Sequence, residues 1–223
     1  MKMTLLELIK YKREQKELAK EIECPIANPL GLKFDSLISI PSVHIPDYIG
    51  DSVEIDCNLK AIENYVRVID DEDFIFTDYL LKYNDKQEHD LKLRVCDEDV
   101  LLLTPYESMP YSDEMHYVLL RTERTGKIQV TENDEQIEYF RVNDMKSHWN
   151  VEVKKLVDDG SHKITKASKI MSHYLKYWDF GREVTTDSGG IVGEFIIVEM
   201  DGTTGWITMR KGSFIDQQFV NII

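Results

Sequence analysis

Short runs of alternating apolar and polar residues, separated by turn residues, recur along most of this chain. The clearest case is residues 194–210, where two β-branched and apolar runs flank a turn that begins at Asp201-Gly202 and ends at Gly205. An Asp-Gly turn between two such runs is a strong hairpin signal, and its length predicts a bulge or a four-residue connection. We therefore expect this stretch to form a hairpin in the middle of a sheet.

The same signals predict many more strands, and two stretches stay ambiguous. In 58–69, Leu59 and Ile62 fit a helical face, but Tyr65 and Val66 suit a strand. We favour the strand, because the acidic run 70–73 then forms a turn. Residues 164–178 fit a strand and a helix equally, whereas 104–113 has two prolines and no periodicity and predicts a loop. The remaining predicted strands are 37–40, 53–57, 74–81, 91–96, 100–103, 115–122, 127–131, 138–142 and 151–157.

The sequence pattern predicts one helix, at residues 4–23, with Thr4 as its N-cap and Glu7 completing a capping box. It ends at Cys24-Pro25, because the residue before a proline is pushed out of the α region. We expect it to pack on its own sheet; docking on a partner is the alternative. The predicted fold class is α+β, predominantly antiparallel β, with an N-terminal amphipathic helix. Residues 1–24 form that helix and 25–223 a β-rich domain, with a candidate subdomain boundary at 104–113.

Charge and cysteine content restrict the classes of partner and the compartment. The 223 residues hold 27 Lys and Arg against 41 Asp and Glu, a net charge of −14. Without a basic cluster, binding to a nucleic-acid backbone or an anionic lipid surface is disfavoured. Three widely spaced cysteines without a CxxC pair suit a reducing compartment. No stretch is long and apolar enough for a signal peptide or membrane insertion, so we expect a cytoplasmic protein.

Patterns for catalysis or metal binding are weak. Asp187-Ser188-Gly189-Gly190 is similar to a protease nucleophile turn over four residues, but a plain glycine turn explains it better. The histidines are scattered, and the chain contains no HExxH. We therefore expect no catalytic residue, no metal and no cofactor. The alternative is a cleft in which His148, Asp144 and His173 converge in the folded protein.

The one predicted interaction surface lies in the stretch 104–113. Tyr106, Met109, Pro110 and Tyr111 place aromatic, sulfur and proline side chains in a segment predicted to be an exposed loop. Such residues are enriched where proteins bind one another. We expect a protein partner there, and self-association is compatible with the same surface.

Four stretches of the chain, between Ile26 and Met209, resemble the YjfK-like family of prokaryotic proteins. They are Asn28-Pro29-Leu30-Gly31-Leu32-Lys33 before a strand with Asp35, the hairpin at 74–81, the aromatic run 174–178 and the strand 194–198. The resemblance implies a cytosolic accessory protein that acts through protein contacts, linked to a membrane-stress system of the phage-shock type, and it implies no catalytic residues. The expected function is a non-enzymatic interaction protein; the alternative is a small-ligand-binding protein or hydrolase with a cleft between sheets.

Overall fold

The computed structural model describes residues 26–34, 36–44, 53–67, 74–83, 90–96, 99–142, 148–165, 168–186, 189–216 and 220–222. Within these ranges the chain is mainly β-strand, with one α-helix and one short 3-10 turn. The elements are β1 (Leu37–Pro41), the 3-10 turn (Ser42–His44), β2 (Glu54–Arg67), β3 (Phe74–Tyr83), β4 (Asp90–Cys96), β5 (Asp99–Pro110), α2 (Asp113–Thr125), β6 (Lys127–Glu132), β7 (Glu135–Arg141), β8 (Trp149–Val157), β9 (Ile170–Thr185), β10 (Ile191–Asp201), β11 (Trp206–Ile215) and β12 (Asn221–Ile222).

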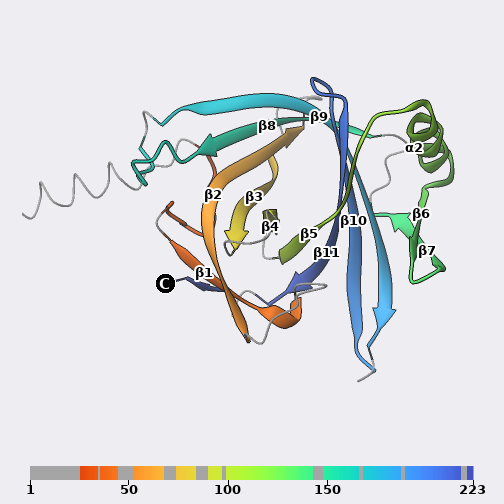
Figure 1. Ribbon diagram of the computed structural model, residues 1–223, viewed down its shortest axis with the longest axis horizontal. Coiled ribbons are helices and arrows are strands. Elements are labelled where there is room, and N and C mark those ends of the chain that lie inside the picture. Colours follow the sequence, from red (N-terminus) through yellow and green to blue (C-terminus); the bar gives the residue numbers. More distant parts are fainter. Residues whose placement is uncertain are drawn as a thin grey trace, which may run out of the picture.

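Eight of these strands close into an antiparallel barrel (Figure 1). Around the ring the order is β2, β3, β4, β5, β11, β10, β9 and β8, and β8 pairs with β2 to complete it. The described residues are mostly strand with a single α-helix, so the predicted α+β class with an N-terminal amphipathic helix is wrong. Both ambiguous stretches supply strands that the ring needs: 58–67 lies in β2 and 170–178 in β9. The predicted helix at 4–23 lies outside the described residues.

The predicted hairpin at 194–210 is confirmed. β10 and β11 pair with Val198 opposite Met209, and four residues connect the two strands. Gly205 ends the connection with φ of 68°, a left-handed conformation that glycine adopts without steric cost.

Two sequence predictions next to each other are wrong. Residues 104–110 form the second half of β5 instead of a loop, and 115–122 lie in α2 instead of a strand. The helix has clear caps: the Ser112 hydroxyl accepts a hydrogen bond from the Met115 N–H at 3.3 Å, and Gly126 ends the helix with φ of 67°. The proposed division into subdomains near 104–113 stays a prediction.

The strands bury side chains on both faces, because other elements cover the outside of the ring. One outer cluster lies between β1, β2, β3, β4 and β5, and includes Ile38, Tyr79 and Leu93. A second lies under α2, β6 and β7, on the outer faces of β9, β10 and β11 (Figure 1). The hydrophobic cluster inside the ring consists of Tyr65, Phe76, Leu101, Leu103, Val151, Val153, Leu175, Tyr177 and Ile197.

In the described part of the chain, no helix has the length and apolar character needed to cross a membrane.

Candidate functional site

A β-bulge in β5 shapes the outer surface next to α2. Opposite β5, Met209 pairs with Glu107 and Arg210 pairs with Pro105, so Tyr106 is the extra residue. A bulge shifts the alternation of side chains by one position. Tyr106 and Glu107 therefore both face outward, and Met109 follows them on the same face, beside α2 and β6.

An apolar hollow of about 280 Å³ lies at this place, between α2, the second half of β5 and β6. Its floor belongs to the outer cluster under α2, because Leu119, Ile128 and Met209 are members of both. Methionine side chains adapt to differently shaped apolar groups, so such a floor suits a docking surface. The residues that line it are Tyr106, Glu107, Met109, Met115, Val118, Leu119, Ile128, Gln129, Val130, Thr131, Val198 and Met209.

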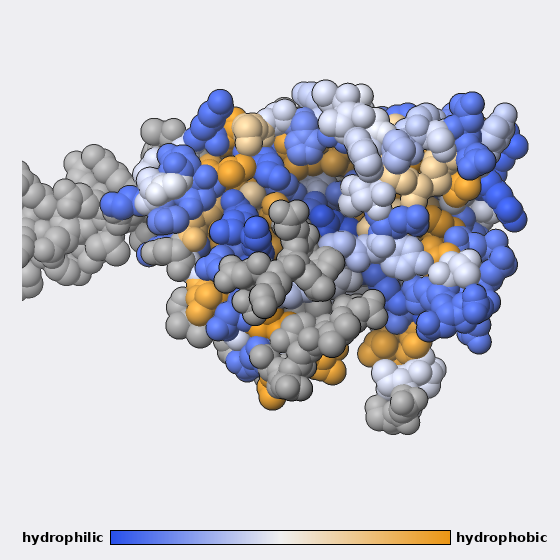
Figure 2. Space-filling model, in the orientation of Figure 1, coloured by the Kyte–Doolittle hydropathy of each residue, from blue (hydrophilic) through white to orange (hydrophobic). Residues whose placement is uncertain are grey.

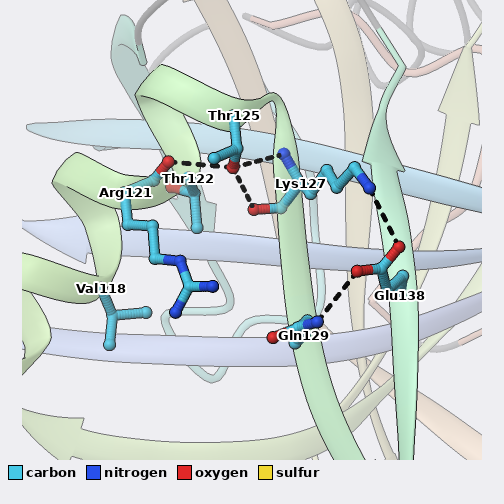
Figure 3. A pocket seen from close by; sticks show the side chains of 7 residues that line it. All are labelled: Val118, Arg121, Thr122, Thr125, Lys127, Gln129 and Glu138. Carbon is cyan, nitrogen blue, oxygen red and sulfur yellow. Dashed lines mark hydrogen bonds and ion pairs between the residues drawn. The ribbon is translucent and has the colours of Figure 1, made fainter.

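A polar hollow of about 340 Å³ continues it toward the end of α2 (Figure 3). Val118 and Gln129 border both hollows, and we call the two together the α2–β6 groove. In the polar part, Lys127 Nζ lies 3.1 Å from Glu138 Oε2, and Gln129 Nε2 donates to Glu138 Oε1 at 2.9 Å. Figure 3 shows the Arg121 side chain extending from α2 toward Gln129. This part of the groove therefore presents a cation beside the strand.

The helix α2 carries exposed apolar groups in the groove and beside it. Val118 lines the groove and is 43% exposed, and the neighbouring Tyr117, outside the groove lining, is 72% exposed. On the space-filling surface, apolar residues interrupt the hydrophilic ones on the side where α2 lies (Figure 2). Clustered exposed apolar side chains on an otherwise charged surface are typical of binding sites.

The barrel interior contains charged groups that bind one another across the ring. The Lys92 ammonium lies 3.0 Å from Glu63 and donates to the Tyr65 hydroxyl at 2.7 Å, which in turn donates to Glu199 at 2.7 Å. Burial alone would raise the pKa of Glu63, but the ammonium groups of Lys92 and Lys155 outweigh it and lower this pKa to about 2. Glu63 is therefore an ionised carboxylate at neutral pH.

A second part of the interior centres on Arg94. Its guanidinium makes two hydrogen bonds to Asp78, at 2.7 and 2.8 Å, and donates to the Tyr177 hydroxyl at 2.6 Å. It also lies 3.6 Å from the centre of the Phe76 ring. Burial raises the pKa of Tyr177 well above its ordinary value, so the phenol stays neutral. These bonds hold β3, β4 and β9 in register, and they leave these groups engaged with one another.

One end of the barrel opens into a third hollow, of about 270 Å³. Lys92, Glu63 and Glu199 form its inner end, whereas His173 and Trp206 lie at the rim strands β9 and β11. A cavity that reaches buried charges is a candidate for a small polar ligand. Among the described residues, no group of three or more His, Cys, Asp and Glu side chains is placed to hold a metal ion.

The four residues of the predicted surface lie in β5 or directly after it. Tyr106 and Met109 line the α2–β6 groove, and the Tyr106 hydroxyl donates to the Thr131 carbonyl at 3.3 Å. Pro110 pairs opposite Trp206 at the end of β5. Tyr111 is 41% exposed, and its hydroxyl binds Nδ1 of His116.

Of the residues of the alternative cleft, the two histidines are not brought together. His148 Nδ1 lies 2.9 Å from Glu123 of α2, whereas His173 lines the barrel opening. Asp144 lies outside the described residues. The interior charges were missed in the sequence because Lys92 and Arg94 follow the ordinary alternation of a strand with one polar face. Their only signal was that the neighbouring strands carry aromatic and acidic residues, and this becomes informative only once the ring is known.

Comparison with family models, with curated proteins and with solved structures finds no match, so the resemblance to the YjfK-like family stays a prediction.

Proposed function

We propose that this chain is a protein-interaction module that binds its partner in the α2–β6 groove. The observation that supports this most directly is an apolar hollow, open to solvent, lined by the exposed Val118 of α2. In the interior, by contrast, the charges are engaged with one another, which favours a scaffold role for the barrel. The link to a membrane-stress system stays a prediction from the family resemblance.

The test compares two valine-to-glutamate variants of equal starting exposure. Val118 lines the groove and is 43% exposed, whereas Val192 lies at the start of β10, away from the groove, and is 44% exposed. A photoreactive residue in place of Tyr117, introduced into both variants, cross-links the bound partner. We expect the cross-linked partner to be retained with Val192→Glu and lost with Val118→Glu. A partner that binds both variants equally, or cross-linking that is no greater than from a photoreactive residue at Tyr174, contradicts the proposal.

A second function is favoured by the hollow at the barrel opening: binding of a small polar ligand. Trp206 at its rim is 48% exposed and provides a fluorescence reporter. Titration with a panel of water-soluble metabolites would reveal a ligand, and the Lys155→Met variant would weaken its binding because Lys155 lines the same hollow. Val118→Glu leaves this binding unchanged, which separates the two functions.

A further inference from the structure

The strand β6 has an edge that faces the α2–β6 groove. β6 and β7 form a hairpin whose two connecting residues, Asn133 and Asp134, have φ of 50° and 66°, the pattern of a type I′ turn. In such a hairpin the flanking pair, Glu132 and Glu135, exchanges both main-chain hydrogen bonds, and the bonded pairs alternate along the ladder. The N–H and C=O groups of Lys127, Gln129 and Thr131 therefore point away from β7.

The ends of this edge already have partners, whereas its centre faces the groove. The Lys127 N–H meets the Thr125 hydroxyl at 3.3 Å, and the Thr131 carbonyl accepts from Tyr106. Gln129 lies between them, on the border of both hollows. β6 ends the order of paired strands, so within the described residues no strand lies against this edge. A free N–H and C=O beside an apolar floor is the arrangement to which an extended peptide adds.

We propose that the partner contributes an extended segment that adds to β6 as an antiparallel strand and fills the α2–β6 groove. This rests on the proposed function and specifies its partner. One peptide residue exchanges two main-chain hydrogen bonds with Gln129. The peptide residues on either side of it lie opposite Ile128 and Val130, whose side chains point to the apolar floor. The segment therefore carries apolar residues at positions i and i+2.

The charges of the groove specify which end of the antiparallel segment is acidic. Lys127, at the beginning of β6, and Arg121 of α2 line the polar part of the groove, whereas Glu107 lines the apolar part. An antiparallel strand runs from the Thr131 end toward the Lys127 end, so its C-terminal part comes beside the two cations. An acidic residue directly after the second apolar residue lies opposite Lys127, which Glu138 already engages at 3.1 Å, so its charge is met mainly by Arg121. The partner segment is therefore expected to have the sequence apolar, any residue, apolar, acidic.

A second copy of the chain fits this edge less well. Its own β6 offers Ile128-Gln129-Val130-Thr131, which has the two apolar residues but places a threonine where the cations favour an acid. The net charge of −14 also opposes association of two copies.

The experiment uses a fluorescein-labelled octapeptide with the core Val-Thr-Ile-Asp and follows its anisotropy on titration with the full chain. A control peptide carries the reversed core Asp-Ile-Thr-Val, which has the same composition. A second control carries an N-methyl group on the Thr between the apolar residues, which removes the N–H that donates to the Gln129 carbonyl. We expect each control to bind at least roughly tenfold more weakly, because each loses the acid contact or a main-chain bond.

The protein variants address the same bond from the other side. Gln129→Pro removes the free N–H, and proline is tolerated on an edge strand where that N–H points outward; Gln129→Ala keeps the main chain. We expect Gln129→Pro to lose peptide binding at least roughly tenfold and Gln129→Ala to keep it. Circular dichroism checks that both variants fold, and the N-methylated peptide tests the bond without altering the protein.

Three results would overturn the proposal. Equal binding of the three peptides would exclude strand addition, while loss of the cross-linked partner in Val118→Glu would still support the proposed function. Absence of any peptide binding, together with a partner that binds Val118→Glu, would exclude both. Sedimentation that shows a dimer for the native chain and a monomer for Gln129→Pro would assign the edge to a second copy instead.

Discussion

Replacing Glu63 by glutamine tests the internal charge network of the barrel. The Glu63 carboxylate oxygens lie 3.0 Å from Lys92 Nζ and 2.7 Å from Lys155 Nζ, and only 6% of the Glu63 side chain is exposed. Its pKa is lowered from 4.5 to about 2, which corresponds to roughly 3 kcal/mol at about 1.36 kcal/mol per pH unit. Glu63→Gln keeps the shape but leaves two ammonium groups without this counter-charge, so we expect a loss of about 3 kcal/mol in the free energy of unfolding at neutral pH.

The pH dependence gives the sharper measurement. Because the pKa of Glu63 is lower in the folded than in the unfolded chain, its contribution is complete above pH 4.5 and is lost as the pH falls toward 2. Urea unfolding followed by tryptophan fluorescence, at pH of about 7, 5 and 3, should show the difference between native chain and variant shrinking below pH 4.5.

Glu138→Gln provides the matched control. Glu138 also pairs with a lysine, Lys127, but its side chain is 39% exposed, so we expect no measurable change in stability. The reasoning is refuted if Glu63→Gln and Glu138→Gln have equal effects at neutral pH, or if the effect of Glu63→Gln is the same at pH of about 7 and 3.

Three further predictions concern the elements around the groove and are measured as free energies of unfolding in urea. Ser112→Ala should cost about 1 kcal/mol, because the hydroxyl caps α2; Ser112→Asp should keep the cap and the stability. Asp134→Gly should stabilise by about 0.5–1 kcal/mol, because φ of 66° suits glycine in a type I′ turn; destabilisation would refute that turn. Gly212→Ala should destabilise by about 1–3 kcal/mol, because its Cβ would lie 2.5 Å from Leu103 Cδ2; unchanged stability would show that Leu103 moves aside freely.

The strands were predictable wherever alternation and turn residues agree. The hairpin of β10 and β11 follows from its Asp-Gly turn, and the short runs at 127–131 and 151–157 lie within β6 and β8. These signals are local, so one sequence suffices to read them. Closure of the ring is not local, because it depends on β8 pairing with β2 and β11 pairing with β5.

The candidate site was predictable only in part. Tyr106 and Met109 were identified by residue type, and both line the groove. The bulge that turns Tyr106 and Glu107 to the same face breaks the period of two, and Pro105 beside it reads as a loop residue. The helix α2 was predicted as a strand because its apolar residues are consecutive at 117–120 and do not follow the helical period. Only Leu119 and Thr122 are buried, so the caps at Ser112 and Gly126 were its main signal.

Closure of the ring has a consequence for synthesis of the chain. β5 ends at Pro110, but its partner β11 begins only at Trp206, so one side of β5 has no mate until β11 has left the ribosome. Pairings between distant segments form slowly, and an unpaired strand is a template for contact with other chains. The synthesis of β11 thus decides when the growing protein covers this edge against aggregation, and a chain that stops before β11 exposes an open β5.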